Sequence, residues 1–266
     1  MNLCWPDIPG QTLRPFNRPV ILLRDPTAMR PEEHPLTPEI DAFWNVLRAR
    51  NPRLRDGAIL TVRDLDLARV PGPATITVAP ASFRHLAVQT EKFELGIRLL
   101  GVKGLIIGRD ESGGEHVWIA RRGPETRISH HMWEIAPAGG VDVFPEGTSP
   151  DAAAVFRRVV VDEAKEELGI DLPPEAADAA HPVAIVHDEI ARSIDVIVRV
   201  DWPGTINPRT GLCTATGCNW EYSDAAWLAR VDAGEFDRKH SAAIVPVMRA
   251  VLRWMGWTAN NTADGP

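Results

Sequence analysis

Three glutamates lie close together near the end of one predicted helix. Glu163, Glu166 and Glu167 are spaced i, i+3 and i+4, so they fall within an arc of roughly 100° on the helix surface. Phe156 and Val159 lie in the same arc one to two turns earlier, so the carboxylates continue the apolar stripe instead of opposing it. Three like charges on a half-buried face are unfavourable unless a cation binds them, and hard oxygen ligands suit Mg²⁺ or Mn²⁺. The spacing therefore predicts a divalent metal site.

The same segment has a second interpretation, because Glu-Ala-Lys-Glu-Glu-Leu-Gly is also typical of an ordinary charged helix end that faces solvent.

The ends of the helix are well marked. Ser149 is the expected N-cap, Pro150 fits the first turn, and Gly169 is a natural left-handed stop. About five turns of helix lie between them, and the sequence around the helix has to decide between the two interpretations.

A strand that runs into a double glycine precedes this helix, over Trp133–Asp142. Together the two segments resemble the Nudix hydrolases, whose motif reads Gly-x5-Glu-x7-Arg-Glu-U-x-Glu-Glu-x-Gly-U, with U an aliphatic residue. Residues 163–170 match its second half after the arginine, with alanine at the first aliphatic position. The resemblance covers about residues 97–230. It implies an α/β fold, a Nudix-like α/β/α sandwich with a mixed sheet, in which the three glutamates and a backbone carbonyl of Ala138 or Gly139 hold the metal.

The chain departs from the family motif in its first half. The arginine position holds Asp162, the upstream glutamate is Ala154, and the first glycine is Thr148. In the family that arginine pairs with that glutamate and steadies the metal site; here we expect Arg158 to pair with Asp162 at i, i+4. Residues 51–57 faintly resemble the N-terminal segment of the Nudix members that split UDP-sugars.

Arginines follow the second strand of the resemblance. Arg121 and Arg122 end an apolar strand, and Arg127 follows in the same loop. Guanidinium forks bind phosphate groups well, so we expect Arg121 and Arg122 to clamp the substrate's phosphates. The other interpretation is a solvated turn.

Two further segments supply candidates. Glu189 follows the strand predicted over 183–186 and is a candidate base or extra acidic ligand; a surface turn is the alternative. Glu221 is a candidate acid, and Trp220 beside it is a candidate stacking face for a nucleobase, although most tryptophans belong to the core. Cys213 and Cys218 lack a second pair or a histidine cluster, so zinc is not expected.

The elements that must position these residues suggest two parts. Residues 1–95 are predicted as an N-terminal α+β extension, with a proline-rich arm, a helix that begins at Thr37, and short strands at 58–62 and 75–78 joined by a turn at 71–73. Residues 96–257 form the expected hydrolase domain, with strands at 101–107, 117–120, 183–186 and 194–200, a loop over 203–219 and a closing helix over 236–254. Residues 258–266 are predicted as a disordered tail. The extension is expected to cap the core or to form a homodimer.

Composition excludes several classes of protein. The 266 residues are 44% apolar and 24% charged, without the roughly 20 consecutive apolar residues of a membrane helix. The net charge of −7 argues against nucleic acid as a partner. The first residues lack a signal-peptide pattern, and three cysteines (Cys4, Cys213 and Cys218) cannot all pair, so we expect a cytoplasmic protein.

The residues together predict an enzyme with a small-molecule nucleotide substrate. The expected reaction is Mg²⁺-dependent (or Mn²⁺-dependent) hydrolysis of the pyrophosphate bond in a nucleoside diphosphate linked to another group, of the NDP-sugar or ADP-ribose type. One of the helix glutamates, Glu163 or Glu167, or else Glu189, would accept the proton. The alternatives are a Nudix-fold module that binds a nucleotide or a protein without catalysis, and a plain structural domain, which would leave the inward-facing carboxylates unexplained.

Overall fold

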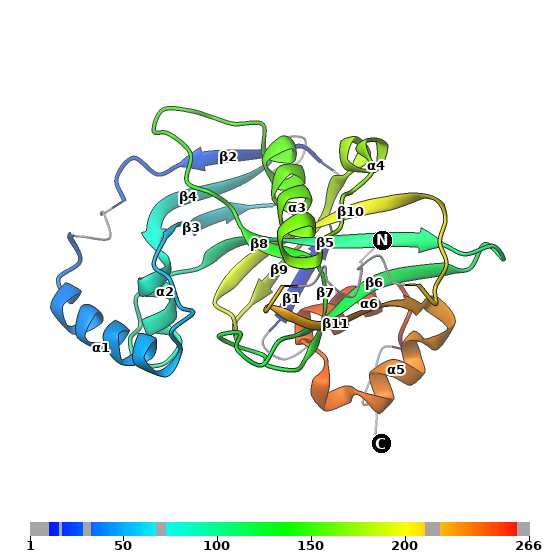
Figure 1. Ribbon diagram of the computed structural model, residues 1–266. Helices are drawn as coiled ribbons and strands as arrows, with labels where there is room; N and C mark the ends of the chain where they lie inside the picture. The colour runs from blue at the N-terminus through cyan, green and yellow to red at the C-terminus, as the bar shows by residue number, and fades with distance from the viewer. Residues whose placement is uncertain (1–10, 16–17, 29–32, 68–72, 211–218, 260–266) are drawn as a thin grey trace, which may run out of the picture.

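One mixed sheet organises the molecule, as the computed structural model shows (Figure 1). The structure describes residues 11–15, 18–28, 33–67, 73–210 and 219–259. The main strand order is β1-β9-β10-β5-β3-β4-β2. In that order the strands are β1 (Gln11–Pro15), β9 (His181–Asp188), β10 (Ser193–Thr205), β5 (Leu99–Arg109), β3 (Ala58–Asp66), β4 (Ala74–Ser82) and β2 (Val20–Arg24). β10 and β5 are parallel, whereas β9 and β10 are antiparallel, so the sheet is mixed.

The long strand β5 is the centre of the sheet. One of its edges pairs with β10 over nearly its whole length, and the other is shared by three partners: β3 at Leu99, β8 (Ala138–Gly140) at residues 101–103, and β6 (Glu115–Arg122) at residues 107–109. β6 in turn pairs with β7 (Trp133–Ile135) and β11 (Tyr222–Ala229). The segments around the double glycine are therefore fixed directly to the central strand.

A helix covers each face of this sheet. On one face α3 (Ala152–Leu168) buries Phe156, Val160 and Ala164 against apolar side chains of β5 and β10, and α4 (Pro174–Ala179) follows it. On the other face α6 (Pro246–Trp254) packs against β1, β6 and β9, beside α5 (Ala233–Lys239). The predicted α/β/α sandwich with a mixed sheet is confirmed.

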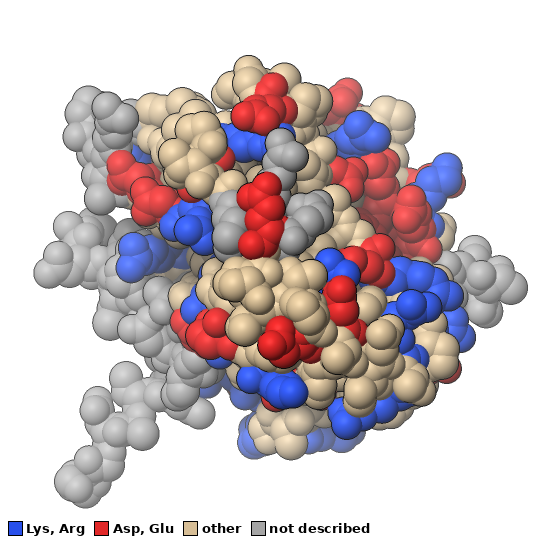
Figure 2. Space-filling model, turned by 90° about the vertical axis from the view of Figure 1, so that its left-hand side faces the viewer, with Lys and Arg blue, Asp and Glu red and all other residues tan. Residues whose placement is uncertain are grey.

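The N-terminal residues extend the same sheet, so the predicted arm packs against the rest of the molecule. β2, β3 and β4 continue it on one side, and β1 pairs with β9 on the other. α1 (Thr37–Arg50) and α2 (Phe83–Gln89) form a small core of their own around Trp44, and they lie at the left of Figure 1. Figure 2 shows this side of the molecule, where basic and acidic side chains are interspersed.

Some predicted boundaries are corrected. The single closing helix over 236–254 is wrong: α5 ends at Lys239 and α6 begins at Pro246, with only short 3₁₀ turns nearby at Arg230–Asp232 and Ser241–Ala243. Proline removes a backbone donor and is disfavoured inside a helix, so Pro246 starts a new one. The N-cap of α3 is Asp151, not Ser149, because the Asp151 carboxylate accepts the Ala153 amide hydrogen at 3.0 Å.

Several predictions concern residues outside the described ranges. They are the three cysteines, the first residues of the chain, most of the turn at 71–73, and the tail from residue 260 onward. Thr258, where the tail was predicted to begin, is buried. No helix among the described residues has both the length and the apolar character needed to span a membrane.

Candidate functional site

The helix α3 presents two of its glutamates on the face that packs on the sheet. Asp151 caps its first turn, and Gly169, at φ +63°, ends it in the left-handed conformation that glycine adopts without strain. Glu167 continues the buried stripe of the helix and is only 4% exposed. Glu163 is half-buried, and Glu166 is exposed. The predicted inward orientation therefore holds for two of the three carboxylates.

Strand β8 receives these carboxylates. The Ala138 amide donates a hydrogen bond to Oε2 of Glu167 at 3.1 Å. A Cβ atom on Gly139 would overlap the carboxylate of Glu163, so the absence of a side chain there lets this carboxylate lie against the backbone. The double glycine and the glutamates of α3, which are 23 positions or more apart in sequence, thus meet in the structure.

A fourth glutamate joins this group from the segment before β11. The Asn219 amide and side chain donate to the carbonyls of Glu167 and Glu166 at 2.9 and 3.2 Å, which holds the segment at the end of α3. Glu221 follows two residues later and raises the pKa of both Glu163 and Glu167 by charge repulsion. Glu163, Glu166, Glu167 and Glu221 are called the acidic cluster below.

The acidic cluster is electrostatically unfavourable as it stands. Burial, followed by repulsion from Glu166 and Glu221, raises the pKa of Glu163 to about 7. Burial and repulsion from Glu221 and Glu163 raise the pKa of Glu167 well above its ordinary value, although the Ala138 hydrogen bond opposes this. Such shifts show that the ionised forms lack compensating positive charge.

The donor chemistry of the acidic cluster fits a hard divalent cation, because carboxylate oxygens are the ligands that such ions prefer. The side chains of the cluster are not arranged as a finished metal site. Among the described residues, no three acidic, histidine or cysteine side chains lie closely enough together to hold a metal ion. The residues present therefore fit the ion by type and charge, and binding would require the side chains to draw together.

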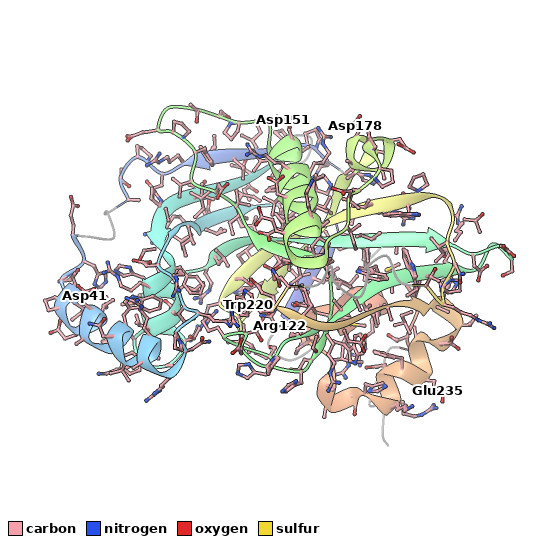
Figure 3. The ribbon with its side chains drawn as sticks, viewed as in Figure 1. Asp41, Arg122, Asp151, Asp178, Trp220 and Glu235 are labelled. Atoms are coloured by element: carbon pink, nitrogen blue, oxygen red, sulfur yellow. The ribbon has the colours of Figure 1, made fainter. Side chains whose placement is uncertain are left out.

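A pocket of about 470 Å³ opens beside β8. Its walls come from β5, β8 and β10, from the loop after β6, from the segment of Trp220 and Glu221, and from residues 51–55 and Phe83 of the N-terminal region. Figure 3 shows Asp151 at the start of α3, and Trp220 and Arg122 near its other end. Of the predicted site residues, Ala138, Arg122, Trp220 and Glu221 line this central pocket.

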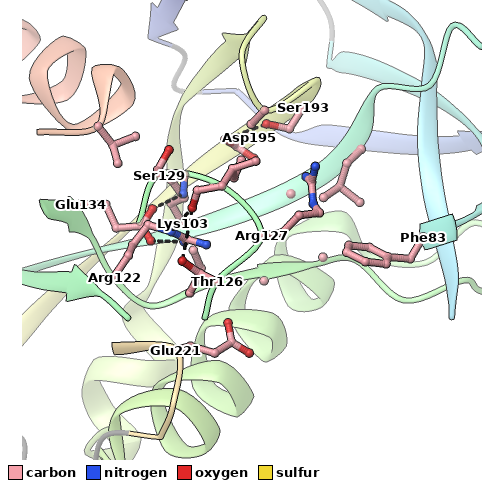
Figure 4. Close-up of a pocket in the computed structure, with 18 of the residues that line it drawn as sticks. Phe83, Lys103, Arg122, Thr126, Arg127, Ser129, Glu134, Ser193, Asp195 and Glu221 are labelled. Atoms are coloured by element: carbon pink, nitrogen blue, oxygen red, sulfur yellow. Dashed lines mark hydrogen bonds and ion pairs between the residues drawn. The ribbon is translucent and has the colours of Figure 1, made fainter. Parts of the chain in front are cut away.

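A buried network forms the floor of the central pocket (Figure 4). Glu134, 2% exposed, accepts a hydrogen bond from Lys103 at 2.9 Å and a close one from Arg122, and the Tyr222 hydroxyl donates to it at 3.2 Å. Burial alone would raise the pKa of Glu134, but Lys103 and Arg122 outweigh it and lower this pKa to about 2. The Arg122 guanidinium is thus held by an acid of the protein itself.

A second buried acid lies on β10. Asp195 accepts a hydrogen bond from Ser193 at 3.1 Å and packs against Gly101, where a side chain would overlap its carboxylate. Burial raises its pKa to about 6, with attraction from Lys103 opposing the shift. The pairing of β10 with β5 brings Asp195 opposite Gly101, which sequence reasoning had not singled out.

The remaining wall of the central pocket is basic. Arg53 forms a close ion pair with Glu125, and its guanidinium lies 5.0 Å from the ring centre of Trp220. Arg55 and Arg127 also line the pocket. Of the acidic cluster, Glu221 lines this pocket, whereas Glu163, Glu166 and Glu167 are not among its lining residues. Basic side chains, supplied partly by the N-terminal residues, thus face the same space as Glu221.

Other predicted residues lie apart from this pocket. Arg121 is exposed and donates to the His131 carbonyl at 3.0 Å. Glu189 pairs with His187 at 3.0 Å and with Arg192 at 3.7 Å. Neither is among the residues that line the pocket.

The predicted pair of Arg158 and Asp162 is confirmed at 3.2 Å. Their side chains are 80% and 54% exposed, so the pair contributes little stability. It lies on the outer side of the helix and does not compensate the charge of the acidic cluster.

No family model matches the chain, and no curated protein matches it. Among solved structures it is similar to a Nudix hydrolase from Alicyclobacillus acidocaldarius, with 12% identity and a TM-score of 0.43 over 60% of this chain and 91% of that one. It is also similar to the Nudix domain of Shewanella oneidensis NrtR complexed with ADP ribose, with 11% identity and a TM-score of 0.36 over 64% and 97% of the two chains.

A third similar structure is the bifunctional NMN adenylyltransferase/ADP ribose pyrophosphatase from Francisella tularensis, complexed with AMP and a manganese ion. Identity is 15% and the TM-score 0.40, over 64% of this chain. The match spans 46% of the Francisella chain, less than half its length. The similarity to these structures is one of fold.

Proposed function

We propose that the protein is a divalent-metal-dependent pyrophosphohydrolase that acts on a nucleoside diphosphate linked to another group. The observation that carries this proposal is the central pocket itself. One wall holds Glu221 and the β8 backbone, against which Glu163 and Glu167 lie, and the other holds Arg53 and Arg55. A diphosphate needs both walls, because metal ions and guanidinium groups neutralise different oxygens.

Glu163, Glu166 and Glu167 would hold Mg²⁺ or Mn²⁺, with Glu221 and the backbone of Ala138 or Gly139 beside them. When bound, such ions neutralise phosphate oxygens and lower the pKa of a bound water. We assign the proton acceptor to Glu163 in preference to Glu189, because Glu163 lies against pocket-lining Gly139, whereas Glu189 is paired with His187 and Arg192.

The organic parts of the substrate would be bound by the chain's own side chains. Trp220 is 40% exposed at the pocket and carries the Arg53 guanidinium beside its ring, an arrangement that suits stacking of a nucleobase. The volume of about 470 Å³ is in the range of small-molecule sites. This supports a nucleotide conjugate such as an NDP-sugar or an ADP-ribose type of compound.

A second candidate function is binding of a nucleotide without turnover. It is favoured by the loose acidic cluster, in which no three metal-ligating side chains converge among the described residues. It is also favoured by Asp162 and Ala154, which replace the arginine and glutamate that steady the site in the family motif.

The two functions are separated by a screen of NDP-sugars, ADP-ribose, dinucleotides and nucleoside triphosphates with Mg²⁺ or Mn²⁺. The enzyme proposal expects two phosphate-bearing products from a conjugate, in a metal-dependent reaction that Glu163→Gln abolishes. Tight binding of a conjugate with no product from it, in either metal, would support the binding module instead.

A further inference from the structure

Arg127 holds an unusual position in the central pocket. It stands in the loop between β6 and β7 and is half-buried. Its Nη1 donates to the Thr90 hydroxyl at 2.9 Å, and its guanidinium carbon lies 5.7 Å from the ring centre of Phe83. The side chain is thus fixed between the loop after β6 and the two ends of α2, at Phe83 and Thr90.

The charge of Arg127 is not neutralised by the protein. Among the described residues, no carboxylate lies within ion-pairing distance of it, and Glu91, whose charge attracts it, pairs with Arg50 at 3.3 Å. Burial and repulsion from Arg122 lower the pKa of Arg127 to about 10, so it stays charged at neutral pH. A half-buried cation without a carboxylate partner is unfavourable, and an anion that enters the pocket would relieve this.

The other buried cations of the pocket differ from Arg127 in this respect, because Lys103 and Arg122 share Glu134. Arg53 and Arg55 also line the pocket but are exposed: Arg53 pairs with Glu125, and Arg55 donates to the backbone carbonyls of Pro52 and Leu54. In Figure 4 Arg127 and Phe83 lie to one side of the network around Glu134, and Glu221 lies on another. The position of Arg127 is therefore distinct from that of Glu221 and from the network around Glu134.

We propose that Arg127 forms an anion subsite for the second group of the substrate, so that the preferred substrates are nucleoside diphosphates whose linked group carries a further carboxylate or phosphate. This inference rests on the proposed function for its substrate class. The acidic cluster would take the diphosphate with its metal, Trp220 the base, and Arg127 the additional anion. Phe83 forms an apolar side of this subsite.

The test compares Arg127→Gln with the wild type on substrate pairs that differ in one anionic group. UDP-glucuronate against UDP-glucose tests a carboxylate, and ADP-ribose 1″-phosphate against ADP-ribose tests a phosphate on the linked group. Arg48→Gln is the matched control, because Arg48 is an exposed arginine of α1 that does not line the pocket.

We expect the wild type to prefer the anionic member of at least one pair, and the pair that responds identifies the anion. Arg127→Gln should lower kcat/KM for that member by about 10-fold or more, mainly through KM, and change the neutral member less than about 2-fold. Arg127→Lys should recover part of the preference, since it keeps the charge without the planar fork. Equal losses on both members, or no loss, would overturn the subsite while leaving the hydrolase proposal intact.

A binding measurement without turnover separates failure of the subsite from failure of the proposed function. About 10 mM inorganic phosphate, without metal, should raise the melting temperature of the wild type and of Arg48→Gln but not of Arg127→Gln. Without phosphate, Arg127→Gln should melt no lower than the wild type, because it removes an uncompensated buried charge. If phosphate stabilises the wild type selectively but no conjugate is hydrolysed, the subsite is supported and the enzyme proposal fails. If phosphate stabilises Arg127→Gln as much as the wild type, or neither protein, the subsite is wrong.

Discussion

The carboxylate of Glu163 lies directly against the α-carbon of Gly139, so that no side chain fits between them. Gly140, the next residue, is different: a Cβ there would meet only the Leu99 side chain, at 3.7 Å, an ordinary contact. One glycine of the pair is therefore required by the acidic helix, and its neighbour is not.

This contrast predicts the effects of two matched substitutions. Gly139→Ala should force Glu163 into another rotamer, at a stability cost of about 1 kcal/mol, and lower the turnover of the best substrate by on the order of 10-fold or more. Gly140→Ala should leave the turnover close to that of the wild type. Steady-state kinetics and urea unfolding of both variants check this, and equal activity in the two would contradict the proposed role of Glu163.

Glu167→Gln is expected to separate catalysis from folding. Glutamine keeps an oxygen that can accept the Ala138 hydrogen bond and removes a buried charge whose pKa is raised by burial and by Glu221. Turnover should fall by on the order of 10², and the metal-free melting temperature should stay the same or rise. Glu175→Gln, on the exposed surface of α4, is the control. Full activity of Glu167→Gln would rule out the proposed mechanism.

Divalent metal is expected to raise the melting temperature near pH 7.5. A bound cation would replace the repulsion among the carboxylates of the acidic cluster with attraction. A ligand present at 100 times its Kd stabilises the folded state by about 2.7 kcal/mol. Melting curves in EDTA and in millimolar Mg²⁺ or Mn²⁺, at matched ionic strength, measure the shift. It should shrink in Glu167→Gln, and an unmoved wild-type melting temperature in both metals would contradict the metal site.

Asp195 gives the stability a defined pH dependence. Its folded pKa, about 6, lies above the ordinary value of 3.8, so its contribution to stability is fully present below about pH 4 and is lost as the pH rises through 6. Asp195→Asn removes this loss. The variant should therefore be more stable than the wild type by about 2–3 kcal/mol at pH 7.5 and nearly equal to it near pH 4. Urea unfolding at both pH values tests this, with exposed Asp178→Asn as the control; a gain of the same size at both values would contradict the assignment.

The adjacent arginines Arg121 and Arg122 should behave differently when replaced. Arg122→Ala leaves buried Glu134 with Lys103 as its remaining basic partner among the described residues, and breaking a buried pair costs about 3–5 kcal/mol. Arg121→Ala removes an exposed side chain and should cost less than about 0.5 kcal/mol. Chemical denaturation distinguishes them. Similar destabilisation by both substitutions would contradict the buried network. Because Arg121→Ala is expected to stay folded, a higher KM of this variant would directly show the substrate contact that the sequence predicts for Arg121.

How much of the site the sequence predicts depends on whether the information is local. The end of α3 at Gly169 and the inward orientation of Glu163 and Glu167 follow from helical periodicity and from the conformational preference of glycine, so they could be predicted. The ion pair of Arg158 with Asp162 follows from i, i+4 spacing for the same reason. These features need only the geometry of one helix.

The network of Lys103, Glu134 and Arg122 could not be predicted in the same way. Its members come from β5, β7 and β6, and they meet only because of the strand order and register. The sequence predicts a phosphate contact for Arg122, and nothing in it marks Lys103 or Glu134 as members of a buried network with Arg122. The same holds for Asp195, which becomes a buried acid through the parallel pairing of β10 with β5.

The fold shows the same division between local and non-local information. Hydrophobic alternation predicts the strands β3 and β4, but not that they continue the central sheet beside β5. β11 was missed because its first residues are polar and follow a long loop. This segment is a strand because it pairs with β6, and its own sequence pattern does not reveal that pairing.

The five backbone pairings between β1 and β9 have a consequence for any shortened form of the protein. β9 carries the alternating apolar residues Ala184 and Val186, and β1 is its outer neighbour in the sheet. A chain that began at residue 96 would present this edge as an open template for a strand from another molecule. Such a chain is expected to assemble edge to edge, with aggregates that light scattering would detect, even if every residue of the acidic cluster were kept.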